Sequence, residues 1–305
     1  MLALIGMAVV ILAVFGGFLL ESGNLFVLLQ PAEVLIVVGA AAGIMLVSNP
    51  PSVLRRIWQD SRWIFRRSPH NRESFLRHLR MLYEVFAYAQ RAGMMQLEPD
   101  VEDPHSSRIF TNHPAFLRDD FTRDFVCDSL RMLVIGITSP HELDQLMELD
   151  IDVQRRGRHH PVAALNSLAD ALPGLGIVAA VLGVVITMEA IGGAPETVGQ
   201  KVAAALVGTF LGILLCYGVV GPAAARLAHV GDSQAQFLQV LRVAIVAFAR
   251  GAAPVLAVEY ARRSIPIELR PSFLELERTI RREARIPPVP NPLGRESVGE
   301  TAASA

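Results

Sequence analysis

The chain has 305 residues, of which 52% are hydrophobic, and its formal net charge at pH 7 is −1. A charge this close to zero gives no electrostatic reason to expect nucleic-acid binding, and two distant cysteines, Cys127 and Cys216, suggest neither a disulfide framework nor a metal site. The sequence holds no glycine-rich nucleotide motif, zinc motif or nucleophile elbow. We therefore expect no enzyme, no cofactor and no metal.

Two apolar stretches open the chain. Residues 2–20 are apolar without a break and lack both a basic leader and a small-residue cleavage site, which indicates a retained transmembrane helix; a signal anchor is the alternative. Residues 34–47 form a second predicted span, which Asn49-Pro50-Pro51 ends. Residues 1–50 are therefore predicted to be a transmembrane hairpin whose turn, 21–31, carries no Arg or Lys.

An Arg- and Trp-rich segment follows the second span. Five arginines flank two tryptophans in residues 54–67, as expected where a chain leaves the membrane on the cytoplasmic side. The segment can also lie in the interface as an amphipathic helix, and a nucleic-acid patch is the less favoured alternative. This places residues 21–31 outside the cell and both chain termini inside.

Residues 51–169 are predicted to be a cytoplasmic region made of helices, which is too small and too helical for an enzyme domain. Helical stripes of apolar residues cover 73–92 and 116–136, with a break at 93–103. A further helix begins with the capping box of Ser139 and Glu142 and is expected to end near Gly157.

A second hairpin, residues 170–225, holds two more apolar helices, 171–191 and 202–225. Small residues spaced by four allow close helix packing in lipid. They are Ala179, Gly183 and Thr187 in the first helix and Ala204, Gly208 and Gly212 in the second. Residues 171–188 and 202–225 contain no Asp, Glu, Lys, Arg or His, so the hairpin is either purely structural or meets a carboxylate on another chain.

The chain ends with a cytoplasmic region and a polar tail. Residues 226–285 are predicted to hold a helix over 226–250 and a charged helix over 272–285. Residues 286–305 are rich in Pro, Gly and Ser and are predicted to be disordered.

Several polar residues near the spans have two interpretations. A hydroxyl at Thr209 or Thr187 can line an ion path or bond to the carbonyl four residues earlier in its own helix, and the second is the more common. Glu33 and Glu189, at span ends, are expected to be solvated, with a transport role as the alternative. Asp170 can gather cations at the inner mouth or cap a helix.

The second hairpin carries the residues of a known family. The run from Pro173 through Gly176 and Gly183 to Val185, and the run Val207-Gly208-Thr209-Phe210-Leu211-Gly212 that leads to Pro222, resemble the MotA family of flagellar motor stator subunits. Further matches lie at 91–102, 258–262 and 270–273, so the resemblance omits only about the last 20 residues. Four spans with a large cytoplasmic loop distinguish this family from the related three-span TolQ and ExbB energisers.

The resemblance implies a fold, partners and roles. Members of the family form a ring in the membrane, described as a pentamer, around two copies of MotB, which supplies a proton-accepting Asp and would answer the missing carboxylate. Residues matching Pro173 and Pro222 couple protonation to the cytoplasmic region, and a residue matching Thr209 faces the proton path, beside Ala180 and Thr187. Sodium-driven relatives carry Thr where this chain has Ala180, which favours protons, with the proton-motive force in place of any cofactor.

The rotor contact departs from the family pattern. The basic residue that contacts the rotor protein FliG aligns with Gln90, its neighbour is Arg91, and the acidic member aligns with Glu98. Either Arg91 makes the contact or other charges do, such as Arg77, Arg80 or Asp150. From the residues alone, Arg91 and Glu98 lie at an exposed turn that is either a partner surface or a solvated loop.

We therefore expect an all-α integral membrane protein with four transmembrane helices, a large helical cytoplasmic insertion and cytoplasmic C-terminal helices. It is expected to be a multi-pass protein of the bacterial inner membrane, both termini cytoplasmic, that turns proton flow into torque. A TolQ/ExbB-like energiser of an envelope process is the alternative, and a membrane scaffold without ion flow is a third possibility.

Overall fold

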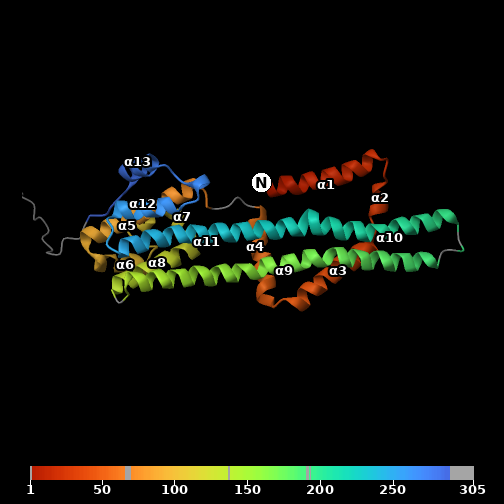
Figure 1. Cartoon of the computed structure of the whole chain (residues 1–305), viewed down its shortest axis with the longest axis horizontal. Helices are drawn as coiled ribbons and strands as arrows, with labels where there is room; N and C mark the ends of the chain where they lie inside the picture. Colours follow the sequence, from red (N-terminus) through yellow and green to blue (C-terminus); the bar gives the residue numbers. More distant parts are fainter. Residues whose placement is uncertain (1, 66–69, 137, 190–191, 193, 289–305) are drawn as a thin grey trace, which may run out of the picture. The chain divides into compact units, whose positions relative to one another are not determined.

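The structure is a computed structural model that describes residues 2–65, 70–136, 138–189, 192 and 194–288. Every element assigned in these residues is helical (Figure 1), so the all-α class is confirmed there. The α-helices are α1 Leu2–Leu20, α2 Leu25–Leu28, α3 Pro31–Ser48, α4 Pro51–Phe65, α5 Arg72–Ala92, α6 Glu98–Glu102, α7 Pro114–Leu117, α8 Asp120–Ile135, α9 Pro140–Met188, α10 Pro195–Leu215, α11 Gly221–Ala249, α12 Pro254–Ser264 and α13 Phe273–Glu283. Short 3₁₀ turns, η1 Met94–Leu97, η2 Phe110–Asn112 and η4 Ile267–Leu269, and the π-helical turn η3 Cys216–Val220 complete the set.

The chain forms two compact units, each built from two separate stretches of sequence. Unit 1 comprises the described residues of 2–65 and 154–233, and unit 2 comprises those of 70–153 and 234–288. Helices α9 and α11 contribute residues to both units without a helix break at the unit boundary.

Unit 1 contains the apolar helices. Among the described residues, three helical stretches are long and apolar enough to cross a membrane, Leu25–Ser48, Pro140–Met188 and Pro195–Ala249, and a shorter apolar helix covers Ile5–Leu20. Pro31 and Pro195 begin α3 and α10, where a missing N–H costs nothing because the first-turn donors have no partner in the helix. Within unit 1, α9 and α10 run side by side (Figure 1).

Unit 2 is built on α5, whose predicted apolar stripe is confirmed. Phe75, Leu79, Leu82 and Phe86 are all at most 2% exposed and pack in one core with residues of α8, α9, α11 and α12. Phe86 stacks on Phe248 with ring centroids 4.4 Å apart. Burial of each such side chain contributes about 1.5–3 kcal/mol, so the face of α5 determines where the other helices of this unit pack.

Helix starts follow the capping residues. The predicted box at the start of α9 is confirmed, because the Ser139 backbone N–H donates to Glu142 Oε2 at 2.8 Å and the Glu142 N–H donates to Ser139 Oγ at 3.3 Å. The helix predicted from residue 116 instead divides into α7 and α8, since Asp119 caps a new helix by accepting the Thr122 N–H at 3.4 Å.

The predicted end of a helix near Gly157 is wrong, because α9 continues unbroken from Pro140 to Met188. A glycine inside a helix costs only about 1 kcal/mol, which packing readily outweighs. A Cβ at Gly157 would lie 3.3 Å from the guanidinium of Arg56 on α4, so the glycine lies against the end of that side chain. The predicted disordered tail, 286–305, lies outside the described residues from position 289 onward.

Candidate functional site

The helices α9 and α10 touch through glycines. A Cβ at Gly176 would lie 2.7 Å from the Gly208 carbonyl oxygen, and a Cβ at Gly212 would lie 2.5 Å from the Leu172 carbonyl oxygen. Both distances are shorter than any side chain tolerates, so the two backbones are in direct contact at these points. Close approach through small residues is how helices associate in lipid, where burial from water no longer drives packing.

The next contact, toward the C-terminal end of α9, is made by the residue after Ala204 and not by Ala204 itself. Gly183 faces Ala205, whose Cβ would be 2.6 Å from a Cβ at position 183, whereas Ala204 is only half-buried. The four-residue spacing was therefore a correct guide for Gly208 and Gly212 and placed the alanine contact one residue too early.

The two threonines of the hairpin make different hydrogen bonds. Thr187 Oγ1 donates to the Gly183 carbonyl of its own helix at 2.8 Å, which is the common arrangement. Thr209 does not follow that arrangement, because its Oγ1 points across the contact and makes a long hydrogen bond, 3.5 Å, to the Gly176 carbonyl of α9. The Thr209 hydroxyl is thus held at the helix–helix contact, while Ala180 is a half-buried neighbour on α9.

Glu33 is buried, so the expectation of a solvated carboxylate is wrong for this residue. Its side chain, on the first turn of α3, is 7% exposed. A Cβ at Gly208 would lie 2.5 Å from Glu33 Oε2, and a Cβ at Gly183 would lie 3.3 Å from Glu33 Oε1. The carboxyl group therefore fits against two glycines of the hairpin, and Oε2 has no hydrogen-bond partner among the described residues.

Sequence reasoning missed this placement although a signal was present. Glu33, Val37 and Ala41 are the buried residues of α3 and follow one another at intervals of four, as expected for one face of a helix. Residues 171–188 and 202–225 carry no Asp, Glu, Lys, Arg or His, but α3 brings a carboxyl group to them. Glu189, the other span-end carboxylate, is exposed as expected.

The two prolines of the hairpin occupy different backbone settings. Pro173 lies inside α9, which also accommodates Pro161. Pro222 is exposed and follows the π-helical turn η3, in which the Gly221 N–H reaches back to the Cys216 carbonyl. A π turn before a proline is one of the few recognised causes of helix irregularity. Asp170 is exposed and, because α9 is continuous there, it does not cap a helix start.

The predicted rotor-contact residues lie around one end of α5 in unit 2. Gln90 and Arg91 are exposed in its last turn, Gly93 ends the helix with φ +93°, and Glu98 is exposed at the start of α6. A positive φ is available to glycine at little cost, and it turns the chain from α5 into η1. Neither Arg91 nor Glu98 makes an ion pair within the described part of the chain.

The three alternative charges differ in how exposed they are. Arg80 is largely buried and pairs with Glu283 and Glu84, the second contact at 3.5 Å. Arg77 is about half exposed, 3.7 Å from Glu73 one turn earlier, and Asp150 is exposed on α9. Arg80 is therefore the weakest of the three as a surface contact.

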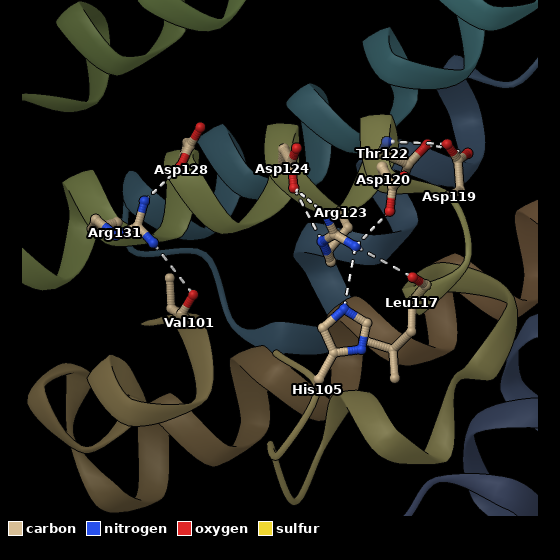
Figure 2. Close-up of polar contacts among 10 residues, drawn as sticks. All are labelled: Val101, His105, Leu117, Asp119, Asp120, Thr122, Arg123, Asp124, Asp128 and Arg131. Atoms are coloured by element: carbon tan, nitrogen blue, oxygen red, sulfur yellow. Dashed lines mark hydrogen bonds and ion pairs between the residues drawn. The ribbon is translucent and has the colours of Figure 1, made fainter. Parts of the chain in front are cut away.

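A charged ridge on α8, which the sequence did not single out, lies beside α6 (Figure 2). Asp120, Asp124 and Asp128 follow one another by four residues and are exposed, while Arg123 is folded inward. Arg123 binds Asp120 at 2.7 Å and Asp124 at 2.8 Å, and these carboxylates raise the pKa of its guanidinium. Arg131 Nη2 donates to the Val101 carbonyl at 3.5 Å and so links α8 to α6. The ridge presents mainly negative charge.

A glycine-packed pair of long apolar helices, with a hydroxyl at their contact and a carboxyl group from a third helix, indicates a membrane protein of the helix-bundle class. The model of the MotA/TolQ/ExbB proton channel family matches residues 118–239, and the model of the Motility protein A N-terminal region matches residues 4–93.

Curated relatives are similar over nearly the full length. Motility protein A of Escherichia coli (strain K12) is 37% identical over 281 residues, which cover 92% of this chain and 95% of that protein. Chemotaxis protein LafT of Vibrio parahaemolyticus is 34% identical over 90% of this chain and 96% of its own length. The chain therefore belongs to the motility protein A family.

Solved structures agree on the fold. The C. jejuni MotAB structure superposes with a TM-score of 0.74 at 20% sequence identity and covers 89% of this chain and 98% of the matched chain. The flagellar MotAB stator complex from Bacillus subtilis gives 0.72 at 21% identity, with 90% and 97% coverage.

Proposed function

We propose that the protein is a stator subunit of a bacterial flagellar motor, which conducts protons together with a MotB-like partner and converts their flow into torque on the rotor. The observation that carries this proposal is the α9–α10 contact, where glycines bring two backbones together and hold the Thr209 hydroxyl across the interface. Relatives over 90% or more of the chain carry the names Motility protein A and Chemotaxis protein LafT.

A second chain is needed to complete the ion path. Residues 171–188 and 202–225 contain no Asp, Glu, Lys, Arg or His, and an intramembrane ion path normally uses an ionisable side chain. The outer part of α9 also has apolar side chains without cover, among them Val181, Val185 and Met188, each more than half exposed. We assign this uncovered surface to a MotB-like partner that supplies an Asp and to lipid.

The transported ion is a proton in this proposal. The proposed path runs beside Thr209, Ala180 and Thr187, and Ala180 offers no hydroxyl ligand where the sodium-driven relatives carry Thr. Oxygen ligands are what a hard cation requires in exchange for its water. Glu33, buried against the same glycines, is a carboxyl group of this chain at the outer end of the hairpin and belongs to the proposed site.

The proposed arrangement places the chain in the inner membrane with four spans, α1, α3, the second half of α9, and α10. Residues 1–50 and 170–225 are the two membrane hairpins, 51–169 and 226–285 are cytoplasmic, and both termini are inside. Arginines on α4 beside the exposed Trp58 support this orientation, since basic residues stay on the cytoplasmic side. Copies form a ring, which we propose is a pentamer.

Torque is proposed to act through surface charges of unit 2 on FliG. Arg91 and Glu98 are exposed, unpaired within the described residues and close in sequence to the Gly93 turn, and Gln90 lies beside them. The charged ridge on α8 extends the same region of exposed charges, because α8 contacts α6. Pro173 and Pro222 are the proposed coupling residues between the spans and this surface.

Swimming in soft agar tests the proposal. A flagellated cell that lacks its own stator would receive this chain with the MotB-like protein encoded beside it. Restored swimming that stops with a protonophore but persists without sodium is the expected result. A stable membrane complex that gives no swimming would contradict the stator function and favour a TolQ/ExbB-like role in the envelope.

A further inference from the structure

Unit 2 exposes an apolar stripe on α9. Leu146, Leu149 and Val153 are 47%, 56% and 53% exposed, and their spacing places them on one face of the helix. The other apolar face of the same segment, which includes Leu143 and Met147, is buried in the core of the unit. A helix segment with a second apolar face needs a second surface to pack against.

The same unit also contains an open hollow of about 590 Å³. Its walls are the outward face of α11 with Val243 and Val246, the α12 side chains Leu256 and Tyr260, and the start of α9 at Asp144. Arg242 and Arg250 lie at its polar edge. The hollow therefore has apolar side chains from α11 and α12 in its walls, and its polar edge carries two arginines that are paired with acidic residues of α9.

The stripe and the hollow lie at the same height along the helix pair. Asp144 accepts from Arg242 at 2.7 Å and from Arg250 at 3.2 Å, and Glu148 accepts from Arg242 at 3.1 Å. These pairs place residues 144–148 of α9 level with residues 242–250 of α11. The stripe, 146–153, is thus level with the α11 residues that line the hollow.

The stripe and the hollow lie on opposite flanks of unit 2. Successive residues of an α-helix are rotated by about 100°, so the stripe lies roughly 150° around α9 from Asp144 and Glu148, which face the hollow. One copy therefore cannot fill its own hollow with its own stripe. A neighbouring copy, rotated about an axis parallel to these helices, brings its stripe to the open hollow without a change in height.

We propose that the α9 stripe of one copy packs into the α11–α12 hollow of the next copy, so that the cytoplasmic units associate head to tail. Such a heterologous contact closes into a ring when the rotation between copies closes. The inference rests on the proposed stator function only in taking the assembly to be a ring; it adds which two faces meet.

The charges at the ends of the two surfaces agree with this contact. Glu142 precedes Leu146 by one turn on the stripe side of α9 and is exposed. Arg250 has a side chain 60% exposed, and its bond to Asp144 places it at nearly the height of Glu142. A docked stripe therefore brings a carboxylate near the guanidinium of the neighbour, which favours the correct register and opposes the inverted one.

Cysteine crosslinking tests the contact. The double variant Leu149→Cys and Leu256→Cys would be expressed with its MotB-like partner in membranes and treated with a short bifunctional maleimide. We expect a ladder of linked chains that stops at one largest species, because each copy joins two neighbours. Each single variant should give no crosslinked chains. The parent chain should give none either, because its Cys127 and Cys216 are buried.

A matched control tests whether the contact requires the hollow itself or is made by any exposed position on α12. Val255 is as exposed as Leu256 but lines a different groove, between α12 and α13. The pair Leu149→Cys and Val255→Cys should therefore give no ladder. A ladder from the pair in which Val255→Cys replaces Leu256→Cys would overturn the head-to-tail contact. A linked dimer from the single variant Leu149→Cys would overturn it as well.

Assembly size gives a second measurement. Leu149→Glu adds a charge to an exposed position, so the fold should persist while the ring is lost; Leu274→Glu, equally exposed on α13, should leave the ring intact. Light scattering of the purified complex reports its mass. An intact ring in Leu149→Glu, with no ladder in the double cysteine variant, would reject the contact even if the cells swim. A ladder in a complex that gives no swimming would instead reject the stator function and leave the contact valid.

Discussion

At the scale of single residues, the site depends on the side chains that its glycines lack as much as on the side chains that are present. Gly176 and Gly212 leave space that backbone atoms of the facing helix occupy, and Gly208 leaves space for Glu33 Oε2 and the Ala179 Cβ. Thr209 is positioned by that contact, because its hydrogen-bond acceptor belongs to the other helix. A single methyl group at one of these glycines therefore has consequences far larger than its size.

Gly208→Ala should destabilise the complex and abolish swimming. The new Cβ would lie 2.5 Å from Glu33 Oε2 and 2.8 Å from the Ala179 Cβ, and such overpacking costs about 1–3 kcal/mol. Gly174→Ala is the matched control, because nothing lies within 4 Å of a Cβ there and alanine favours a helix by about 1 kcal/mol. Thermal unfolding of the purified complex should shift in opposite directions for the two variants; equal shifts would refute the close contact.

Thr209→Val should lower proton flux while Thr187→Val should not. Valine keeps the shape of threonine in each case, but only Thr209 loses a hydroxyl that crosses between helices. Proton uptake by cells expressing the chain with its MotB-like partner measures the flux directly. A pure scaffold predicts the same small packing effect for both variants, and unchanged flux in Thr209→Val would support that scaffold.

His78 should make unit 2 sensitive to acid. Burial lowers the pKa of this imidazole to about 4, with a smaller contribution from His70, while its bond to the Ser74 carbonyl and Asp119 act in the opposite direction. An unfolded His has a pKa of about 6.5, so the unfolded state binds more protons below that pH and stability falls as the pH drops from about 6.5 toward 4.

Between pH 7.5 and pH 5, the loss from His78 should be about 2 kcal/mol in the opening of α5. Hydrogen exchange of the α5 amides, corrected for the intrinsic rate, measures it in the intact complex. His78→Gln should flatten that dependence because glutamine does not titrate. An equal pH dependence in both proteins would assign the acid sensitivity to other groups.

At the scale of elements, amphipathic helices were predictable where the pattern is local. The stripe of α5, the capping box of Ser139 and the charged segment predicted from residue 272 need only neighbouring residues, and the structure confirms a helix in each. The start of α8 was missed because Asp119 caps a new helix within the stretch that the sequence predicted to be one helix. Local sequence could not show that Gly157 continues α9, since its neighbour Arg56 is about a hundred residues away.

The site was predictable only in part for the same reason. Four-residue spacing identified Gly208 and Gly212, but the partner of each glycine lies on another helix, so the contact of Gly183 with Ala205 was one residue off. Glu33 was expected to be solvated because span ends usually are; its burial depends on α3 packing against α10, which periodicity in α3 alone indicates only weakly.

The prolines of the long helices should differ in their effects. Pro222→Ala restores a backbone donor just after the π turn η3 and should let the helix become regular, so we expect a stable complex that no longer swims. Pro173→Ala should behave alike within α9. Pro161→Ala, also inside α9, is the control and should swim. Loss of swimming in all three, with stable complexes, would assign the effect to helix stiffness in general.

At the scale of the whole molecule, the two units divide the work. The glycine contacts and Glu33 lie in unit 1, whereas the exposed charges around the Gly93 turn and the α8 ridge lie in unit 2. Both units contain parts of α9 and α11, so these two helices continue from the unit of the proposed ion path into the unit that carries the proposed rotor surface.

Charge reversal tests the proposed rotor contact without a change in the stability of the fold. Glu98→Lys combined with Arg91→Glu changes two exposed side chains that make no ion pair within the described residues, so the thermal stability of the complex should be unchanged and swimming should be lost. Asp100→Ala, two residues from Glu98, should do the reverse: its buried carboxylate accepts from Ser107 Oγ at 2.7 Å and from the Arg108 N–H at 3.1 Å, and its loss should cost about 1–3 kcal/mol. Normal swimming in the reversed-charge variant would move the rotor contact to the α8 ridge, where Asp124→Lys should then abolish swimming while assembly in the membrane persists.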